Sequence, residues 1–169
     1  GEEEQSNIYF NSALFALTIL CVILLIPVII LSAFFSKVFQ VPAGFETDTS
    51  WLFFYVIFST FIMAVTSPFL VSTFVRHRFD LSNSVKMVGR LLRVIFYVVC
   101  FTYLSVSLKY FGLSYIGMAL FVLVCSIVLA RRLTPQLQVN WRSFSWQAIC
   151  KMGAMSTWIA VNQVGALLY

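Results

Sequence analysis

The sequence has little charge: Asp, Glu, Lys and Arg make up only 10% of its 169 residues. A soluble domain carries roughly 25% of these residue types. The chain is instead 61% hydrophobic and 17% aromatic. Apolar stretches of about 20 residues recur along it, which is the pattern of membrane-spanning helices. The composition therefore excludes a soluble globular domain and predicts an all-α, polytopic transmembrane helical bundle.

Acidic residues are the scarcest charged type. None of the six lies inside an apolar segment, because they occupy the N-terminal tail, the first loop and position Asp80. A carboxylate within the membrane is the usual sign of ion coupling in a transporter, so this stretch is not expected to hold a coupling site. The four cysteines have no close spacing and no histidine companions, and there is no glycine-rich phosphate loop. We expect no metal, no cofactor and no catalytic site.

Five apolar segments are predicted to cross the membrane. They are residues 8–35, 51–75, about 85–108, 111–130 and 152–169. Pro27 interrupts the first segment and Pro68 the second, and membrane helices tolerate such breaks, which often mark bends. The chain begins with Gly and stops within an apolar run, so we expect it to be a piece of a longer protein.

The basic residues alternate between the junctions of these segments. Nine Lys and Arg flank the second and fourth junctions, and two flank the first and third. The positive-inside rule explains this better than a nucleic-acid partner does, and it places the second and fourth junctions in the cytoplasm. The fourth junction, about 20 residues long, carries Trp141, Phe144 and Trp146 among polar residues, which favours a chain lying along the lipid headgroups.

Residues 76–93, RHRFDLSNSVKMVGRLLR, concentrate five of the eleven Lys and Arg residues. Lys86, Arg90, Arg93 and Tyr97 fall within about 60° of one another on a helix. Such a stripe either reaches toward anionic lipid headgroups or lines a site for a phosphate-bearing substrate, which Arg binds with paired donors. The spacing leaves both interpretations open.

Other polar residues also allow two interpretations. One face of the second segment carries Tyr55, Ser59, Thr66 and Thr73, which serve either helix packing or a polar cavity. In the last segment, Asn162 and Gln163 are costly against lipid and are expected to face a cavity or a protein partner. Before the third segment lie four candidate N-cap residues: Asp80, Ser82, Asn83 and Ser84.

These motifs together resemble the polysaccharide-biosynthesis family of lipid-linked oligosaccharide flippases, within the multidrug/oligosaccharidyl-lipid/polysaccharide exporter superfamily. The resemblance is carried by FQVP after the first segment, SPFLVSTFVRHRFDLSNSVKMVGRLLR and ARRLTPQL. Four residues match the family's loop motif: Arg78, Phe79, Asp80 and Asn83. Members of this family are similar to one another in having about twelve or more helices, arranged in two lobes around a central cavity. Two early helices and most of the second lobe would be missing here.

The resemblance implies an organisation and a function. Residues 1–131 would end the first lobe as helices three to six, 132–151 would connect the lobes in the cytoplasm, and 152–169 would start the second lobe as helix seven. The implied function is transport, not catalysis. It is the flipping of an undecaprenyl-diphosphate-linked oligosaccharide from the cytoplasmic to the periplasmic leaflet of a bacterial inner membrane, for surface polysaccharides such as the O-antigen of lipopolysaccharide.

On this interpretation, the expected substrate-binding residues are Lys86, Arg90, Arg93, Tyr97, Asn162 and Gln163. The expected partners are the lipid-linked oligosaccharide and membrane lipids, with a polysaccharide polymerase and glycosyltransferases as further candidates. Two alternatives stay open: a cation-coupled multidrug exporter of the same superfamily, and a non-transporting membrane scaffold for envelope-glycan enzymes.

Overall fold

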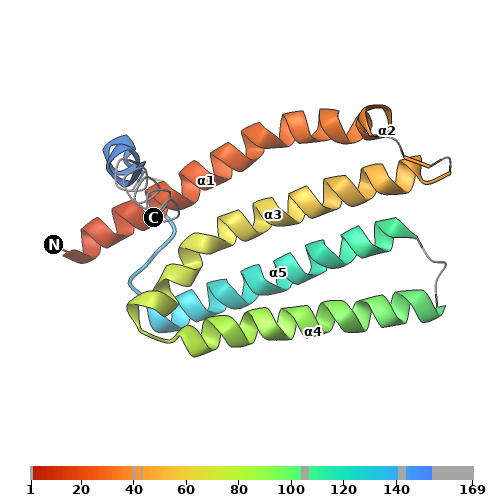
Figure 1. Ribbon diagram of the computed structural model, residues 1–169. Coiled ribbons are helices and arrows are strands. Elements are labelled where there is room, and N and C mark those ends of the chain that lie inside the picture. The colour runs from red at the N-terminus through yellow and green to blue at the C-terminus, as the bar shows by residue number, and fades with distance from the viewer. Residues whose placement is uncertain (1, 40, 43, 104–106, 141–143, 154–169) are drawn as a thin grey trace, which may run out of the picture. The chain divides into compact units, whose positions relative to one another are not determined.

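The described residues of the computed structural model are 2–39, 41–42, 44–103, 107–140 and 144–153. Within these ranges the regular structure is helical and there is no strand, which confirms the predicted all-α class. The helices labelled in Figure 1 are α1 (Glu2–Ala33), α2 (Phe35–Val38), α3 (Glu46–Val75), α4 (Phe79–Tyr103) and α5 (Leu108–Leu133). Residues 146–153 are also helical.

The chain divides into two compact units. One contains Gly1–Leu17 and Gln136–Tyr169, and the other contains Thr18–Pro135. The helix α1 therefore contributes its first half to one unit and its second half to the other. Helices α2 to α5 belong entirely to the second unit.

Three helices of the described ranges are long and apolar enough to cross a membrane: Glu4–Ala33, Glu46–Val75 and Leu108–Leu133. At 1.5 Å per residue each is about 39 Å or longer, which exceeds a hydrocarbon core of about 30 Å. The segment predicted at 85–108 corresponds to α4, which does not meet the same criterion because Lys86, Arg90 and Arg93 interrupt its apolar run. The segment predicted at 152–169 lies almost wholly outside the described residues.

Helices α3 and α5 run parallel and pack closely through small residues (Figure 1). A Cβ atom built on Gly112 would lie 3.0 Å from Tyr55 Cβ and 3.2 Å from Leu52 Cα. Such short side chains let two backbones approach, which is how helices associate in lipid. The buried residues of α5 are Gly112, Ser114, Ala119, Val122, Ser126 and Ala130.

The hydroxyl face of α3 belongs to this interface. Ser59, Thr66 and Thr73 are buried, and each hydroxyl donates a 2.7 Å hydrogen bond to a carbonyl three or four residues earlier in the same helix. A hydroxyl satisfied in this way needs no partner from a cavity. The face that the sequence left open between packing and a polar cavity is therefore a packing face, with Tyr55 against Gly112.

Polar contacts fix the register of α3 and α5 at both ends. At the start, the Asp48 carboxylate accepts a hydrogen bond from the Ser107 hydroxyl and lies 3.5 Å from Lys109 Nζ. At the other end, Arg76 Nε donates to the Leu133 carbonyl at 3.1 Å. Cationic groups at a helix C-terminus are favourable because the last carbonyls lack partners within the helix. These contacts at the two ends of the helix pair fix how α3 and α5 are aligned along their shared interface of small residues.

The turn between α3 and α4 is a Schellman motif. The Arg78 N–H donates to the Thr73 carbonyl at 2.8 Å, and the His77 N–H donates to the Phe74 carbonyl at 3.0 Å. His77 occupies the left-handed position with φ of 53°, where glycine is usual but histidine is tolerated. The helix α4 begins at Phe79, so Asp80 lies in its first turn. None of the four candidates is therefore the N-cap residue itself, although the Asp80 carboxylate accepts backbone hydrogen bonds from Leu81 and from Asp80 in this first turn.

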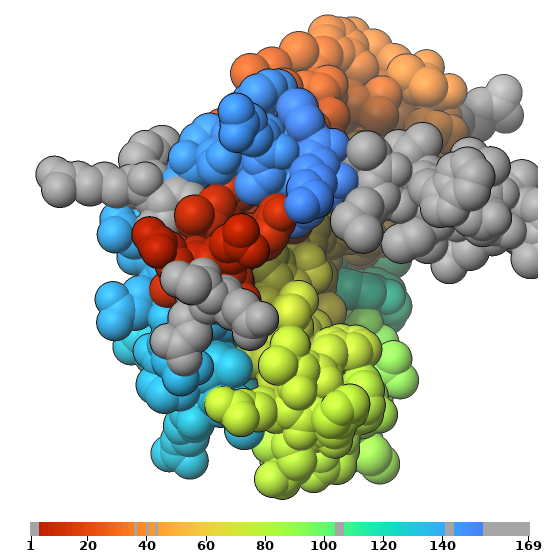
Figure 2. Space-filling model, turned by 90° about the vertical axis from the view of Figure 1, so that its left-hand side faces the viewer, coloured from red at the N-terminus to blue at the C-terminus, as the bar shows by residue number. Residues whose placement is uncertain are grey.

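In the first unit, two asparagines of α1 hold the connection that follows α5. Asn7 Nδ2 donates to the Gln136 carbonyl at 2.9 Å, and Asn7 Oδ1 accepts from the Gln138 N–H at 3.0 Å. Asn11 repeats the pattern two residues later: its Nδ2 donates to the Gln138 carbonyl and its Oδ1 accepts from the Asn140 N–H, both at 2.8 Å. Figure 2 shows the start of α1, in red, against the blue residues of the same unit.

This hydrogen bonding is possible because the spacing of Asn7 and Asn11 along the helix matches the spacing of alternate residues along the connecting chain. Four residues of an α-helix rise about 6 Å, and two residues of an extended chain rise about 6.6 Å. Each asparagine amide therefore meets the extended backbone as a neighbouring strand would, with one donor and one acceptor. Asn11 is fully buried, as is Ser12, whose hydroxyl oxygen accepts from the Ser145 N–H at 2.9 Å. We call this arrangement of Asn7, Asn11 and residues 136–140 the asparagine ladder.

Substitution of Gly112 by Ala should destabilise the second unit. The new methyl group meets the α3 backbone at Leu52 Cα as well as Tyr55, so the helices must separate, at a cost of about 1–3 kcal/mol. Gly117→Ala, on the same helix with no atom within 4 Å of the added Cβ, is the control. It should be neutral or slightly stabilising because Ala favours a helix over Gly. Thermal unfolding in detergent measures both, and equal midpoints for the two variants would contradict the close contact.

The asparagine ladder predicts a reciprocal pattern of amide hydrogen exchange. Asn11→Leu removes the acceptor of the Asn140 N–H and should speed its exchange roughly 5–30-fold, leaving the Gln138 N–H protected by Asn7. Asn7→Leu should do the reverse. The measurement is the hydrogen-exchange rate of the Gln138 and Asn140 amides, followed at single-residue resolution in each variant. If the two variants sped up the same amides, the paired hydrogen bonding would be wrong.

Candidate functional site

The basic stripe of α4 lies beside the surface through which α4 contacts α5. Gly89 is buried, and a Cβ built on it would lie 3.3 Å from Val122 Cγ2 and 3.4 Å from Met118 Cγ. The absence of a side chain at Gly89 thus lets side chains of α5 pack against the α4 backbone. Lys86, Arg93 and Tyr97 lie one or two turns away on nearly the same side and are half-buried.

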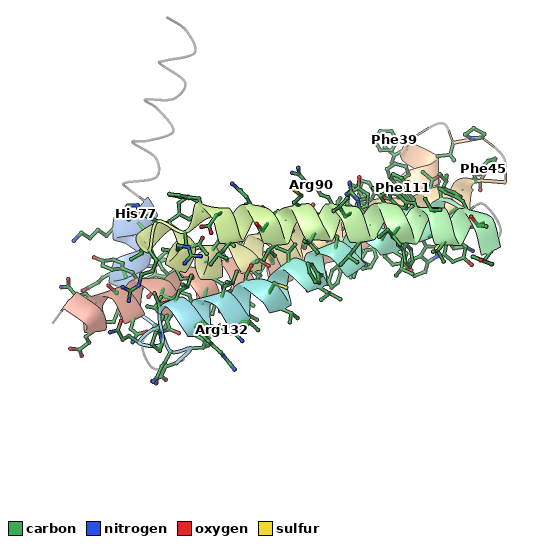
Figure 3. The ribbon with its side chains drawn as sticks, turned by 90° about the horizontal axis from the view of Figure 1, so that it is seen from below. Phe39, Phe45, His77, Arg90, Phe111 and Arg132 are labelled. Carbon is green, nitrogen blue, oxygen red and sulfur yellow. The ribbon has the colours of Figure 1, made fainter. Side chains whose placement is uncertain are left out.

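The stripe is not uniform in the structure. Arg90 follows Gly89 by about 100° around the helix, which carries its side chain to the exposed edge of the face. It is exposed, and in Figure 3 it points away from α5. The structure therefore brings Lys86, Arg93 and Tyr97 onto the side next to α5 and leaves Arg90 outside. Sequence spacing alone could not separate these residues.

Arg93 is held by aromatic rings from two helices. Its guanidinium carbon lies 4.4 Å from the centroid of the Tyr115 ring on α5 and 6.0 Å from that of Tyr97. Tyr97 in turn stacks on Phe111, with centroids 4.6 Å apart and rings 3° from parallel. A cation above an aromatic face gains about 0.5–2 kcal/mol, more where water is excluded. We call Arg93, Tyr97, Phe111 and Tyr115 the Arg93 cluster.

Two polar atoms of the Arg93 cluster are buried without a partner. Arg93 Nε and Tyr97 Oη make no hydrogen bond within the described ranges. A buried donor left unpaired costs about 1–3 kcal/mol, and more when the group is charged. The guanidinium is positively charged, so an anionic acceptor satisfies its donor better than a neutral one does. The cluster is therefore suited to an anionic ligand that accepts hydrogen bonds from these donors.

Arg78, Phe79, Asp80 and Asn83, which carry part of the resemblance noted in the sequence, form a separate feature. Arg78 Nε lies 3.2 Å from Asp80 Oδ1, and both side chains are more than half exposed. Hydrogen bonding from Arg78 lowers the pKa of Asp80, so the pair stays ionised over the physiological range. Phe79 packs edge-on against Phe74, and Asn83 is exposed. Asp80 precedes Arg93 by 13 residues, which is about 20 Å along a helix, so the motif does not reach the Arg93 cluster.

Two predicted site residues, Asn162 and Gln163, lie outside the described residues. Two residues of the cluster were not predicted: Phe111 and Tyr115. The sequence does contain a signal for them, because aromatic residues four apart share one face of a helix. Their ring centroids lie 5.7 Å apart. Only the pairing of α4 with α5 shows which basic residue they meet.

No protein-family model and no solved structure matches the chain at a significant level. Among curated proteins, the chain is similar to the "Uncharacterized membrane protein EpsK" of Bacillus subtilis (strain 168). The two are 27% identical over 172 aligned positions, which cover 100% of this chain and 34% of that protein. The chain thus spans about a third of the length of this relative. The likeness to a membrane protein agrees with the three candidate spans, and the chain is an all-helical membrane protein.

Proposed function

We propose that the chain is part of a flippase that moves a diphosphate-linked, lipid-borne oligosaccharide across a bacterial inner membrane. The observation that carries the proposal is the buried, unpaired Nε of Arg93 beside the unpaired hydroxyl of Tyr97. A diphosphate has several oxygen acceptors and a negative charge, so it satisfies both donors and offsets the charge of Arg93.

The aromatic rings determine how Arg93 would meet this substrate. The guanidinium carbon of Arg93 lies over the Tyr115 ring, 4.4 Å from its centroid. The planar guanidinium of arginine can donate two parallel hydrogen bonds to a phosphate. Lys86, two turns earlier on the same half-buried side, adds a second positive charge. Arg90, which is exposed, would serve mainly to reach anionic headgroups.

The rest of the molecule is consistent with a larger transporter. The apolar side chains of α1 from Ile19 to Leu31 are largely exposed, which suits lipid or further helices of a longer protein. The resemblance to lipid-linked oligosaccharide flippases supports the substrate class. We assign residues 1–131 to the end of a first lobe, 132–151 to a cytoplasmic connection and 152–169 to the start of a second lobe. The role is transport and not catalysis.

The main alternative is a cation-coupled exporter of the same superfamily. Such coupling usually needs a carboxylate at membrane depth. In this sequence all six acids lie at or before the start of α3 or at Asp80, near the start of α4. The positive character of the α4 stripe favours an anionic substrate over a cationic one.

Replacement of Arg93 by Gln in the full-length protein should reduce glycan export at least tenfold. The variant removes the positive charge and the Nε donor, and charged hydrogen bonds contribute about 1.5–3 kcal/mol each. Arg132→Gln is the matched control, because Arg132 lies at the exposed end of α5 and eight basic residues remain at the two junctions (Figure 3). Surface polysaccharide and lipid-linked repeat units on the inner leaflet are measured at equal membrane abundance.

Repeat units should accumulate on the inner leaflet in the Arg93 variant and not in the Arg132 variant. Labelling of a cysteine introduced at His77 with an impermeant reagent checks that orientation is unchanged. Wild-type export by Arg93→Gln would show that the Arg93 cluster does not bind the substrate.

A further inference from the structure

A groove of about 660 Å³ lies in the second unit between the end of α1 and the start of α3. It is within the size range of about 300–1,000 Å³ that is usual for small-molecule sites. A hydrogen bond of 2.8 Å from the Ser32 hydroxyl to the Ser50 carbonyl ties the two helices together beside it. The lining residues are Ile29, Ser32, Ala33, Glu46, Thr47, Ser50, Trp51 and Phe54.

The polarity of the groove changes along the helix axes. Glu46 and Thr47 lie where the candidate span of α3 begins, and Ala33 lies where that of α1 ends. Phe54 lies eight residues further into α3, which is about 12 Å, and Ile29 lies about 6 Å before the end of α1. The groove is therefore polar at the end of the spans and apolar further in, as a phospholipid is from headgroup to acyl chain.

The charge at the polar end is negative. Glu46 is exposed and is one of the residues that line the groove, and its carboxylate makes no ion pair within the described part of the chain. Asp48, on the same turn, is already paired with Lys109 and Ser107. One free carboxylate at the headgroup level attracts an ammonium group and repels an anionic headgroup.

We propose that this groove binds one phospholipid with a primary-amine headgroup. Its ammonium group pairs with Glu46 and donates to the Thr47 hydroxyl, and one acyl chain runs past Trp51 toward Ile29 and Phe54. The site is distinct from the Arg93 cluster and does not depend on the proposed transport. It would anchor the junction of the first two candidate spans to the membrane interface, where tryptophan is favoured.

Trp51 is 47% exposed in the groove and can report on its occupant. The full-length protein, with every other Trp replaced by Phe, is reconstituted in phosphatidylcholine bilayers. These contain increasing fractions of phosphatidylethanolamine or phosphatidylglycerol brominated on the acyl chain, and bromine quenches the fluorescence of a tryptophan that it touches. Half-maximal quenching should need about two- to five-fold less of the ethanolamine lipid, as expected for one exposed ion pair.

Two variants make the test specific. Glu46→Gln should remove the preference between the two lipids while leaving maximal quenching unchanged. Ala33→Phe, which fills the groove, should lower maximal quenching by both lipids. Equal quenching by the two lipids in the unsubstituted protein would mean non-selective lipid contact and overturn the proposal. Absence of quenching by either lipid would mean that another part of the protein covers the groove, which also overturns it.

Discussion

The contact of α3 with α5 at Gly112 is the constraint on which the second unit depends. The absence of a side chain at this position lets the two backbones approach until Tyr55 and Leu52 touch α5. The same turn of α5 also carries Phe111 and Tyr115, which meet Tyr97 and Arg93 of α4. One helical turn therefore packs α3 on one side and positions the Arg93 cluster on the other. The polar contacts at Asp48 and Arg76 hold this alignment from both ends.

The placement of Arg93 is costly for stability. The partial burial of a charged guanidinium beside α5 is unfavourable because it displaces water from the charge, and the cation–π contact with Tyr115 offsets only part of this cost. The unpaired Nε adds to the cost. A side chain required only for orientation would extend to the headgroups, as the exposed Arg90 can. The structure instead keeps Arg93 against two aromatic rings, and the proposed binding of an anionic substrate rests on this arrangement.

Much of the fold could be predicted from the sequence, because apolar runs of this length form helices in a membrane whatever their partners. The predicted segments 51–75 and 111–130 lie within α3 and α5. The helix starts were harder to predict. The helix α1 begins at Glu2, before the predicted start at residue 8, and the amide of Asn7 in this added turn pairs with a residue more than 120 positions away. Asp48 is retained in α3 by Ser107 and Lys109. Such partners are distant in sequence, so local patterns do not reveal them.

The candidate site was predictable in its residue types but not in its geometry. The spacing of Lys86, Arg90, Arg93 and Tyr97 predicted one shared face, but in the structure only Lys86, Arg93 and Tyr97 are half-buried and Arg90 is exposed. A rotation of about 60° between Arg90 and Arg93 separates an exposed side chain from a half-buried one, and only the position of α5 decides which is which. The contact between Arg93 and the Tyr115 ring likewise depends on how α4 packs against α5.

The most direct test of the central claim is equilibrium binding of undecaprenyl diphosphate to the purified full-length protein in lipid nanodiscs. The comparison is between the unsubstituted protein, Arg93→Gln and Arg132→Gln, at one fixed salt concentration. We expect Kd to rise at least tenfold for Arg93→Gln, which corresponds to about 1.4 kcal/mol, and to change less than about twofold for Arg132→Gln, because Arg132 is exposed. Equal affinity of Arg93→Gln and the unsubstituted protein would contradict the claim that the Arg93 cluster binds the diphosphate.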